Sequence, residues 1–285
     1  MHLLIEKEIS CEDKILKPDF SSKAGRELLA FYLQAKFKQV LAYDKKCSSP
    51  IFREVSPTFI SRFTKRLINS PSRRLLIGIT GESASGKSTI CKEIKNVIEH
   101  NSMPVSVLST DNYFNDISDL IKKYGSFDDL TDNGYDIDAP ENFQLELLKN
   151  DLEDLAQGKD VLAPRYVPNG TGVSIPKSQE IKSDKIVVVE GIATMYQDVK
   201  DSFDVRIYIE TENDLRRERF IKRAIAERNQ SKENALKQWE YLKHAGEKYV
   251  VPCRDCADFV LDGNSDLHYL DEILRYIYTI TNNFQ

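Results

Sequence analysis

The residues best suited to chemistry form one glycine-rich run that satisfies the pattern G-x-x-x-x-G-K-[ST]. The run consists of Gly81, Glu82, Ser83, Ala84, Ser85, Gly86, Lys87 and Ser88, and Thr89 follows it. In such a loop the glycines let successive backbone N–H groups turn towards phosphate oxygens, and the next helix adds its partial positive charge. Lys87 is expected to contact the β- and γ-phosphates of ATP, and Ser88 is expected to bind Mg²⁺. The sequence therefore predicts a phosphate-binding P-loop.

The position of this run in the sequence supports that interpretation. A short apolar run at residues 75–79 precedes it, and residues 87–100 follow with the spacing of an amphipathic helix. A glycine-rich turn that binds nothing, which is the alternative, does not require this order of strand, loop and helix. The pattern alone is shared by GTPases, ATPases, motor proteins and kinases. The sequence contains neither N-K-x-D nor D-x-x-G, which argues against a GTPase.

The elements that must position this loop alternate between short apolar runs and longer amphipathic segments. Helices are expected in most of the intervals, and two segments rich in Gly, Pro, Asp or Asn, residues 124–142 and 164–176, are predicted to be loops. The alternation predicts an α/β fold, a P-loop NTPase-type parallel sheet flanked by helices. Buried parallel strands are predicted at residues 75–79, 105–109, 185–189, 205–209 and 259–261.

Residues 1–72 differ in character and are predicted to form an N-terminal helical extension. One helix can be capped by Ser21 or Ser22, and a second is expected to start at Ser56. The P-loop domain is then expected to cover residues 73–285. An amphipathic helix in the extension must bury its apolar face, either on that domain or in a homo-oligomer.

Composition disfavours several other classes of protein. The chain has 285 residues, 41% of them hydrophobic, which is enough for one sizeable core. Its 40 Lys and Arg against 45 Asp and Glu give a net charge of -5, so a nucleic-acid partner is not expected. No apolar stretch has the length of a signal sequence or membrane span, so no membrane partner and a cytoplasmic location are predicted. The five cysteines are predicted to be reduced thiols, and Cys253-x-x-Cys256 lacks the second pair that a zinc site needs.

Four further segments resemble the uridine kinase and phosphoribulokinase family. They are STDNYF, IDAPENF, IVVVEGI and ERFIKRAIAER, which begin at residues 109, 137, 186 and 218. They are similar to the family's D-x-[FY]-[YF] segment, its F-D-H-P-x-A-F segment, its strand ending in E-G-[IL] and its lid helix. With the P-loop, the resemblance covers nearly all of residues 75–280. It implies an ATP-dependent small-molecule kinase that transfers the γ-phosphoryl group to a hydroxyl with Mg²⁺ as cofactor.

The resemblance implies roles for three acidic residues. Asp111 would be the general base that accepts the proton of the acceptor hydroxyl. An aspartate that caps a turn is the alternative. Asp138 and Glu190 would bind Mg²⁺ directly or through water. Asp138 has several acidic neighbours in the sequence, so a position in a solvated acidic loop is an equally good interpretation of this residue.

Several arginines belong to the segment that resembles the lid helix. Arg216, Arg219 and Arg223 lie at i, i+3 and i+7, so they share one helix face. The resemblance implies that Arg223 and Arg228 act on the transferred phosphoryl group and that Arg219 contacts the nucleotide. Arg254, in a segment similar to the family's P-T-K-x-Y-A-D run, is expected near the nucleotide base. A solvated basic helix face is the alternative.

The acceptor is the least specified part of the prediction. The resemblance implies that it is contacted by Tyr113, Tyr166 and Gln238. Residues 164–173 stand where uridine kinases carry P-x-Y-D-F-x-x-H-x-R, but Val167, Thr171 and Val173 replace the polar residues. This departure removes the evidence that the site reads a pyrimidine.

Three interpretations therefore stay open. The acceptor is a nucleoside such as uridine, or it is a sugar, sugar phosphate, glycerate or pantothenate-like alcohol handled by related kinases. From a different class, the chain is a non-catalytic ATP-binding regulator whose extension recruits a partner.

Overall fold

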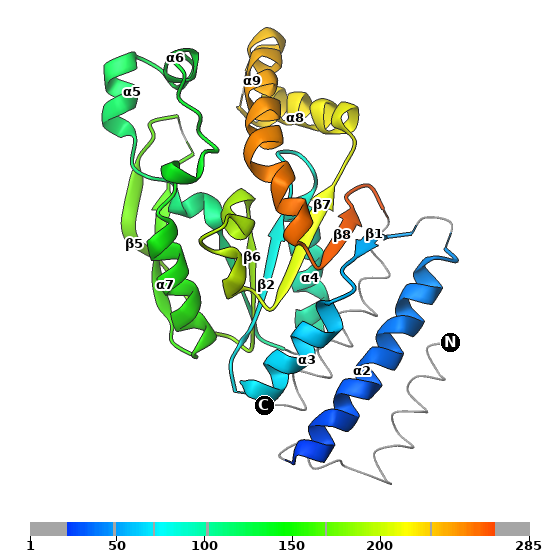
Figure 1. Cartoon of the computed structure of the whole chain (residues 1–285). Coiled ribbons are helices and arrows are strands. Elements are labelled where there is room, and N and C mark those ends of the chain that lie inside the picture. The colour runs from blue at the N-terminus through cyan, green and yellow to red at the C-terminus, as the bar shows by residue number, and fades with distance from the viewer. Residues whose placement is uncertain are drawn as a thin grey trace.

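A six-stranded sheet lies at the centre of the molecule, with helices on both faces (Figure 1). The computed structural model describes residues 22–47, 50–70, 72–100, 103–168, 170–228 and 230–265. The sheet has the order β1-β8-β7-β2-β6-β3, in which β1 alone is antiparallel to its neighbour. The predicted α/β fold and its five predicted strands are confirmed. The six strands are β1 (Phe52–Val55), β2 (Leu75–Thr80), β3 (Val105–Ser109), β6 (Ile186–Glu190), β7 (Val205–Glu210) and β8 (Phe259–Asp262).

Helices and short turns of helix fill most of the intervals between strands. The longer helices are α2 (Lys23–Asp44), α3 (Phe59–Asn69), α4 (Lys87–His100), α7 (Leu145–Ala156), α8 (Asn213–Arg228) and α9 (Lys232–Ala245). The shorter ones are η1 (Thr110–Tyr113), α5 (Ser118–Tyr124), α6 (Phe127–Asp132), η2 (Pro140–Asn142), η3 (Ile192–Met195), η4 (Lys200–Ser202), η5 (Gly246–Val250) and η6 (Val251–Cys256). Among the described helices, none is both long and apolar enough to cross a membrane.

Alternate residues of β2 build the two faces of the core. Leu75 and Ile77 belong to the hydrophobic cluster that includes residues of α3 and α4. Leu76 belongs to the cluster on the opposite face, which includes residues of α7. Every residue of β2 is buried, as expected of a strand covered on both sides. Gly78 suits this strand because a Cβ atom there would lie 2.8 Å from the ring of Phe203.

The strand β1 lies in the segment where the sequence predicts only helices. It pairs with β8, so part of the N-terminal 72 residues extends the main sheet. The strand was missed because it is four residues long and two of them, Arg53 and Glu54, are charged and exposed. It therefore lacks the apolar run by which the other sheet strands were recognised.

The helix α3 packs directly on the sheet. Its buried residues Phe59, Phe63 and Leu67 belong to the same cluster as β2. Arg66 donates through Nε and Nη2 to the two carboxylate oxygens of Asp204, over 2.6 and 3.0 Å. The carboxylate of Asp204 in turn accepts a hydrogen bond from the backbone of β2. This helix is thus held by apolar packing and by a bidentate ion pair.

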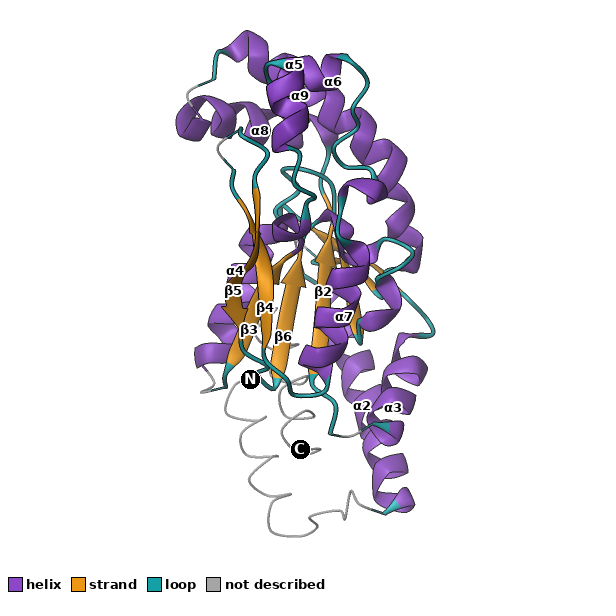
Figure 2. Cartoon of the chain, turned by 90° about the vertical axis from the view of Figure 1, so that its left-hand side faces the viewer, coloured by secondary structure: helices purple, strands orange, loops and turns teal. Residues whose placement is uncertain are grey.

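Two segments predicted to be loops contain regular structure. Residues 164–176 overlap an antiparallel hairpin of β4 (Val161–Tyr166) and β5 (Ser174–Ile181), which lies beside β3 (Figure 2). Pro164 concealed β4 in the sequence, and the pairing shifts register at that position. In the other segment Ser126 caps the short helix α6, because its hydroxyl accepts from the N–H of Asp129 over 3.0 Å.

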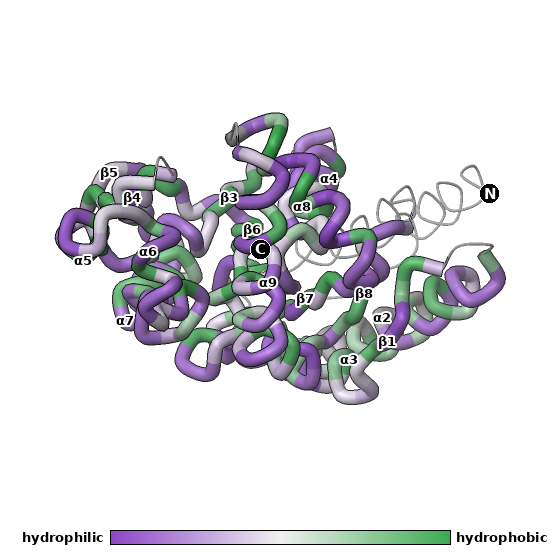
Figure 3. The backbone as a smooth tube through the Cα atoms, turned by 90° about the horizontal axis from the view of Figure 1, so that it is seen from above, coloured by the Kyte–Doolittle hydropathy of each residue, from purple (hydrophilic) through white to green (hydrophobic). Residues whose placement is uncertain are grey.

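The helices α8 and α9, hereafter the lid helices, stand above the carboxyl ends of the strands (Figure 1). Viewed from above, they are largely hydrophilic (Figure 3). They pack on each other through a small cluster of their own. The fold thus places the lid helices over the edge of the sheet at which the P-loop lies. The buried members of their cluster are Phe220, Ala224, Ala235 and Trp239.

Candidate active site

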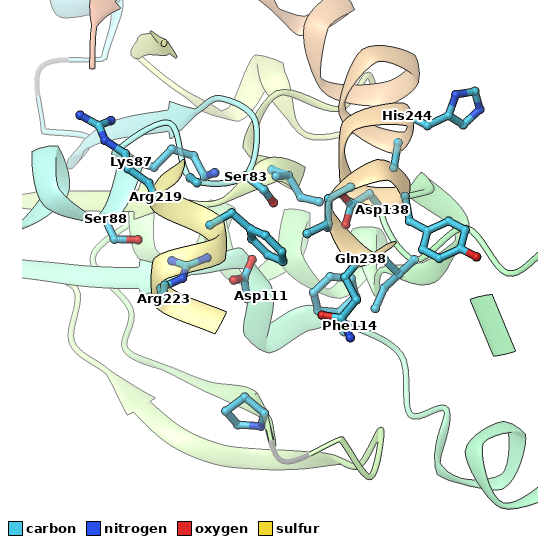
Figure 4. A pocket seen from close by; sticks show the side chains of 18 of the residues that line it. Ser83, Lys87, Ser88, Asp111, Phe114, Asp138, Arg219, Arg223, Gln238 and His244 are labelled. Atoms are coloured by element: carbon cyan, nitrogen blue, oxygen red, sulfur yellow. The ribbon is translucent and has the colours of Figure 1, made fainter. Parts of the chain in front are cut away.

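A cavity of about 1280 Å³ opens at the carboxyl ends of the parallel strands. Its walls come from the P-loop, η1, the segment between α6 and η2, the turn between β4 and β5, both lid helices and the turn after β8 (Figure 4). Pockets for single small ligands measure roughly 300–1,000 Å³, so this cavity has room for a nucleotide and a second molecule. Open α/β sheets bind their ligands at this edge.

The P-loop joins β2 to α4 and holds three residues in the left-handed region of backbone conformation. Gly81, Ala84 and Gly86 have φ values of 146°, 62° and 103°. A Cβ atom on Gly81 would lie 2.4 Å from the carbonyl oxygen of Ile209, so only glycine fits there. The carbonyl of Ser85 accepts a hydrogen bond from the hydroxyl of Thr211 over 2.8 Å, which fixes the loop from behind. This is the curled backbone that phosphate binding requires.

Lys87, the first residue of α4, turns back towards this loop. Its Nζ donates to the carbonyl oxygen of Glu82 over 3.0 Å. Burial lowers the pKa of Lys87, while the carboxylates of Glu190, Asp111 and Asp138 act in the opposite direction. Burial is the largest of these effects, so the pKa of Lys87 lies below its ordinary value despite the three carboxylates.

Glu190 brings together the ends of two neighbouring strands and the start of α4. It is the last residue of β6, and its Oε1 accepts from the hydroxyl of Ser109 at the end of β3 over 3.0 Å. Its Oε2 accepts from the hydroxyl of Ser88 over 3.2 Å. The two residues expected to bind Mg²⁺ at the P-loop are thus in direct contact.

Asp111 and Asp138 line the cavity close to Lys87. Asp111 lies in η1, directly after β3, and Asp138 precedes η2. Asp138 is 6% exposed, so it does not lie in a solvated loop. Burial and the nearby charge of Asp111 raise the pKa of Asp138 to about 7, and Lys87 opposes this rise. The site thus contains two neighbouring carboxyl groups with different environments.

The arginines predicted on the lid divide into two groups. Arg219 and Arg223 both line the cavity from α8 (Figure 4). Arg219 donates to the carbonyl of Gly263, in the turn after β8, over 3.3 Å. Arg216, in contrast, is fully buried beneath the helix. The backbone of Arg228 ends α8, and its side chain lies outside the described part of the structure.

The structure does not bring two of the predicted residues to the cavity. Tyr113 points into the core, where its hydroxyl donates to Asp151 over 2.6 Å. Arg254 lies at the edge of the sheet, where it donates to Glu54 and Glu210. The nucleotide and substrate roles predicted for them from the sequence have no support in these positions. The remaining P-loop residues divide between the cavity lining, which includes Ser83, Ala84, Gly86 and Thr89, and the supporting backbone of Gly81, Glu82 and Ser85.

Tyr166 and Gln238 also line the cavity, and Gln238 lies on the side away from Lys87 (Figure 4). Their roles towards the acceptor stay predictions. Gln238 donates to Oδ1 of Asp128 over 2.8 Å. Several other lining residues were not predicted from the sequence, because they come from segments far apart in the chain. They are Phe114, Phe127, Asp128, Thr131, Tyr135, Asp136, Tyr241 and His244. The acidic stretch before residue 142 was the one signal that pointed to some of them.

The P-loop, the carboxylates beside it and the arginines of α8 together define a phosphotransferase of the P-loop class. Comparison with known proteins places the chain more closely. The model of the family described as Phosphoribulokinase / Uridine kinase matches residues 76–267. The chain belongs to this family, and it is an ATP-dependent small-molecule kinase.

Two curated relatives and one solved structure illustrate the relationship. Uridine-cytidine kinase B of Dictyostelium discoideum is 30% identical over 205 residues, which are 71% of this chain and 80% of the relative. Uridine-cytidine kinase 2-B of Danio rerio is 29% identical over 218 residues, 73% of this chain and 80% of the relative. The structure of phosphoribulokinase from Rhodobacter spheroides superposes with a TM-score of 0.51 at 13% identity, covering 68% of this chain and 71% of the other. That likeness shows a shared fold.

Proposed function

We propose that the protein transfers the γ-phosphoryl group of ATP to a hydroxyl of an uncharged small metabolite, with Asp111 as general base. The observation that carries this proposal is the meeting of Asp111, Lys87 and Glu190 beside the P-loop in one cavity. Phosphoryl transfer needs little covalent chemistry from the protein, so positioning and charge do most of the catalysis. Here Lys87 and the loop N–H groups would hold the phosphates, and Asp111 would accept the proton of the acceptor hydroxyl.

The residues beside the P-loop fit Mg²⁺ as the cofactor. Ser88 and Glu190, already in contact, would hold the ion, and Asp138 would hold it through water. Within the described residues no cluster of three or more His, Cys, Asp or Glu forms a self-sufficient metal cage. Mg²⁺ is commonly bound by one or two carboxylates together with substrate phosphates, so this donor set suits it. When bound, the ion neutralises charge on the phosphates.

The arginines of the lid would complete the phosphate end. Arg219 and Arg223 both line the cavity from α8, and Nη1 of Arg219 would lie 3.9 Å from a Cβ atom on Gly86 of the P-loop. Guanidinium groups at this position stabilise the charge of the transferred phosphoryl group more strongly in the transition state than in the ground state. Arg228 stays a predicted member of the same group.

The charges on the cavity wall support an uncharged acceptor. Among the described lining residues, Lys87, Arg219 and Arg223 are the lysines and arginines, and all three belong to the phosphate end. Lys248, close to the other end, is paired with Asp136. A sugar phosphate, glycerate or a pantothenate-like acid would place its anionic group among tyrosines and aspartates without a cation to neutralise it. An uncharged nucleoside or sugar has no anionic group and therefore avoids this energetic cost.

ADP release with ATP, Mg²⁺ and a panel of alcohols tests the proposal. We expect ATP consumption to depend on an added acceptor, with at least one neutral nucleoside or sugar turned over and with glycerate, pantothenate and sugar phosphates inactive. Release of ADP only with an anionic acceptor would contradict the uncharged acceptor. Slow ADP release that no alcohol accelerates would favour the ATP-binding regulator instead.

A further inference from the structure

One buried ion pair joins the P-loop to the lid helices. The side chain of Arg216 is 1% exposed, and its Nη1 lies 2.7 Å from Oε2 of Glu82. Arginine is almost never fully buried unless it is paired. Glu82 is the second residue of the P-loop pattern, and Arg216 lies in the first turn of α8. The pair therefore links the phosphate-binding loop to the helix that carries Arg219 and Arg223.

The same guanidinium also orients the backbone of the loop. Its Nε donates to the carbonyl oxygen of Ser83 over 3.1 Å. In a trans peptide the C=O and the following N–H point in opposite directions. Because Arg216 draws the Ser83 carbonyl to the lid side, the N–H of Ala84 is turned the other way. Glu82 adds a second restraint, since its own carbonyl accepts from Lys87. Arg216 thus acts on the part of the loop that must present N–H groups to phosphate.

The pair also touches the second lid helix. The guanidinium carbon of Arg216 lies 5.3 Å from the centre of the Trp239 ring in α9. At the end of α9, a Cβ atom on Gly246 would lie 2.8 Å from Oε1 of Glu82, so the helix end and the carboxylate are in close contact. Trp239 directly follows Gln238, which lines the acceptor end of the cavity. The pair is therefore in contact both with the P-loop and with the helix that contributes Gln238 to the cavity.

One donor and one acceptor atom of the pair make no hydrogen bond to the described residues. Nη2 of Arg216 and Oε1 of Glu82 are buried and have no hydrogen-bond partner among the described residues. A buried ion pair adds little stability compared with well-packed apolar side chains, so stability alone is a weak reason for this arrangement. Spare donors and acceptors allow the two side chains to change partners when the loop or the lid moves.

We propose that Glu82 and Arg216 are positioning residues. They couple nucleotide binding in the P-loop to α9, which contributes Gln238 to the cavity wall. Occupation of the loop by phosphates shifts the Ser83 carbonyl, Arg216 follows it, and Trp239 and Gln238 move with Arg216. The proposal rests on the proposed function for the identity of the two sites. Its first test uses binding alone and does not depend on turnover.

Trp239 is the only tryptophan in the chain, so its fluorescence reports on this contact directly. We expect ADP with Mg²⁺ to change the emission of the wild-type chain. In Glu82→Gln and in Arg216→Lys the change at saturating ADP should fall to less than half, with saturation verified by calorimetry. The matched controls are Glu218→Gln and Arg217→Lys, exposed neighbours on α8, which should respond as the wild type does. No emission change in the wild type would overturn the proposal.

Steady-state kinetics with the acceptor found by ADP release gives the second test. At saturating ATP, Glu82→Gln should raise the acceptor KM about fivefold or more, the lower end of ordinary coupling between sites. The kcat should fall by a smaller factor, because the side chain at position 82 is not among the groups that contact the reacting atoms. An unchanged acceptor KM in a folded Glu82→Gln chain would contradict the coupling.

A second variant keeps the proposal testable if a lone buried charge unfolds the chain. The double variant Glu82→Gln with Arg216→Met removes both charges and should recover most of the wild-type Tm. Coupling requires that this stable variant still lacks the Trp239 response to bound ADP. A pair that is merely structural predicts the opposite, a recovered Tm together with the full response, and that result would overturn the proposal.

Discussion

The hydroxyl of Ser88 donates a hydrogen bond to Oε2 of Glu190 over 3.2 Å, which joins the start of α4 to the end of β6. A second serine, Ser109, holds the other carboxylate oxygen. The carboxylate is thus oriented before any ligand arrives. Such preorganisation matters for an ion that keeps most of its water and gains few protein ligands.

The first prediction concerns this carboxylate. Glu190→Gln should raise the Mg²⁺ concentration needed for half-maximal activity by about tenfold or more, because an uncharged amide binds the ion less well. The measurement is ADP release as a function of Mg²⁺ at fixed ATP. Glu146→Gln, exposed on α7, is the control. An unchanged Mg²⁺ requirement would exclude Glu190 from the metal site.

The second prediction concerns the general base. Asp111→Asn should lower kcat by roughly 10²-fold or more and leave the affinity for ADP nearly unchanged, because base loss acts on the chemical step. Stopped or coupled ADP assays give kcat, and calorimetry gives the affinity. Asp119→Asn, exposed on α5, should have neither effect. A wild-type kcat in Asp111→Asn would leave this aspartate with a structural role.

The third prediction follows from the buried contact between Tyr113 and Asp151. Tyr113→Phe leaves the carboxylate of Asp151 without its donor, so stability should fall by about 1–3 kcal/mol. Burial raises the pKa of Asp151 above its ordinary 3.8. The hydrogen bond from Tyr113 favours the ionised form of Asp151 and opposes this rise. Its loss in Tyr113→Phe raises the pKa of Asp151 further, so the loss of stability should be larger at pH 7 than at pH 4. The measurements are the Tm of Tyr113→Phe and of the wild type at both pH values, and the KM for the acceptor. A large change in this KM with an unchanged Tm would instead support the substrate role predicted for Tyr113.

The fourth prediction concerns the N-terminal segment. The division between residues 72 and 73 stays a prediction, and it implies that a chain starting at Ser70 folds and binds ATP. The packing of Phe63 and the pairing of Arg66 with Asp204 lead us to expect otherwise. A chain starting at Pro50 should bind ATP with the wild-type affinity, whereas one starting at Ser70 should be insoluble or lose much of its Tm. Equal Tm and affinity for the two chains would place the boundary after α3.

The fifth prediction is that uridine and cytidine are poor acceptors. In the hairpin, Val167 and Val173 are joined by a backbone hydrogen bond of 2.9 Å, and the cavity is lined there by Tyr166 and Pro168. The polar side chains that uridine kinases carry in this segment are therefore missing from the wall. A kcat/KM for uridine above about 10⁴ M⁻¹s⁻¹, an ordinary value for an enzyme with its own substrate, would contradict this prediction.

The sequence predicted what depends on contiguous residues. The P-loop is a single run of residues whose function follows from its own backbone. Strands such as residues 186–190 were recognised in the sequence as apolar runs. Glu190 and Asp111 were predicted from the resemblance, and in the structure each lies at or just after the end of such a strand. The carboxyl ends of parallel strands meet at one edge, so adjacency in space followed from the order of elements.

The sequence could not predict the direction of individual side chains. Tyr113 and Asp111 are two residues apart, yet one enters the core and the other lines the cavity, because η1 turns the chain between them. Helical spacing grouped Arg216 with Arg219. The burial of Arg216 depends on its contact with the carboxylate of Glu82, which is far away in the sequence and so could not be predicted from helical spacing. The acceptor wall was missed for a related reason, since it is assembled from four separate segments.

The pairing of β1 with β8 also constrains how the chain folds. Arg53 donates to Asp262, 209 residues further along, so the edge of the sheet closes only when both ends of the domain are available. Of the described strands, β1 leaves the ribosome first during synthesis and its partner β8 last. Contacts so distant in sequence slow folding, and an unpaired strand edge exposed meanwhile is prone to aggregate. The two exposed charges of β1 reduce that hazard, because charged edge strands resist pairing with other chains.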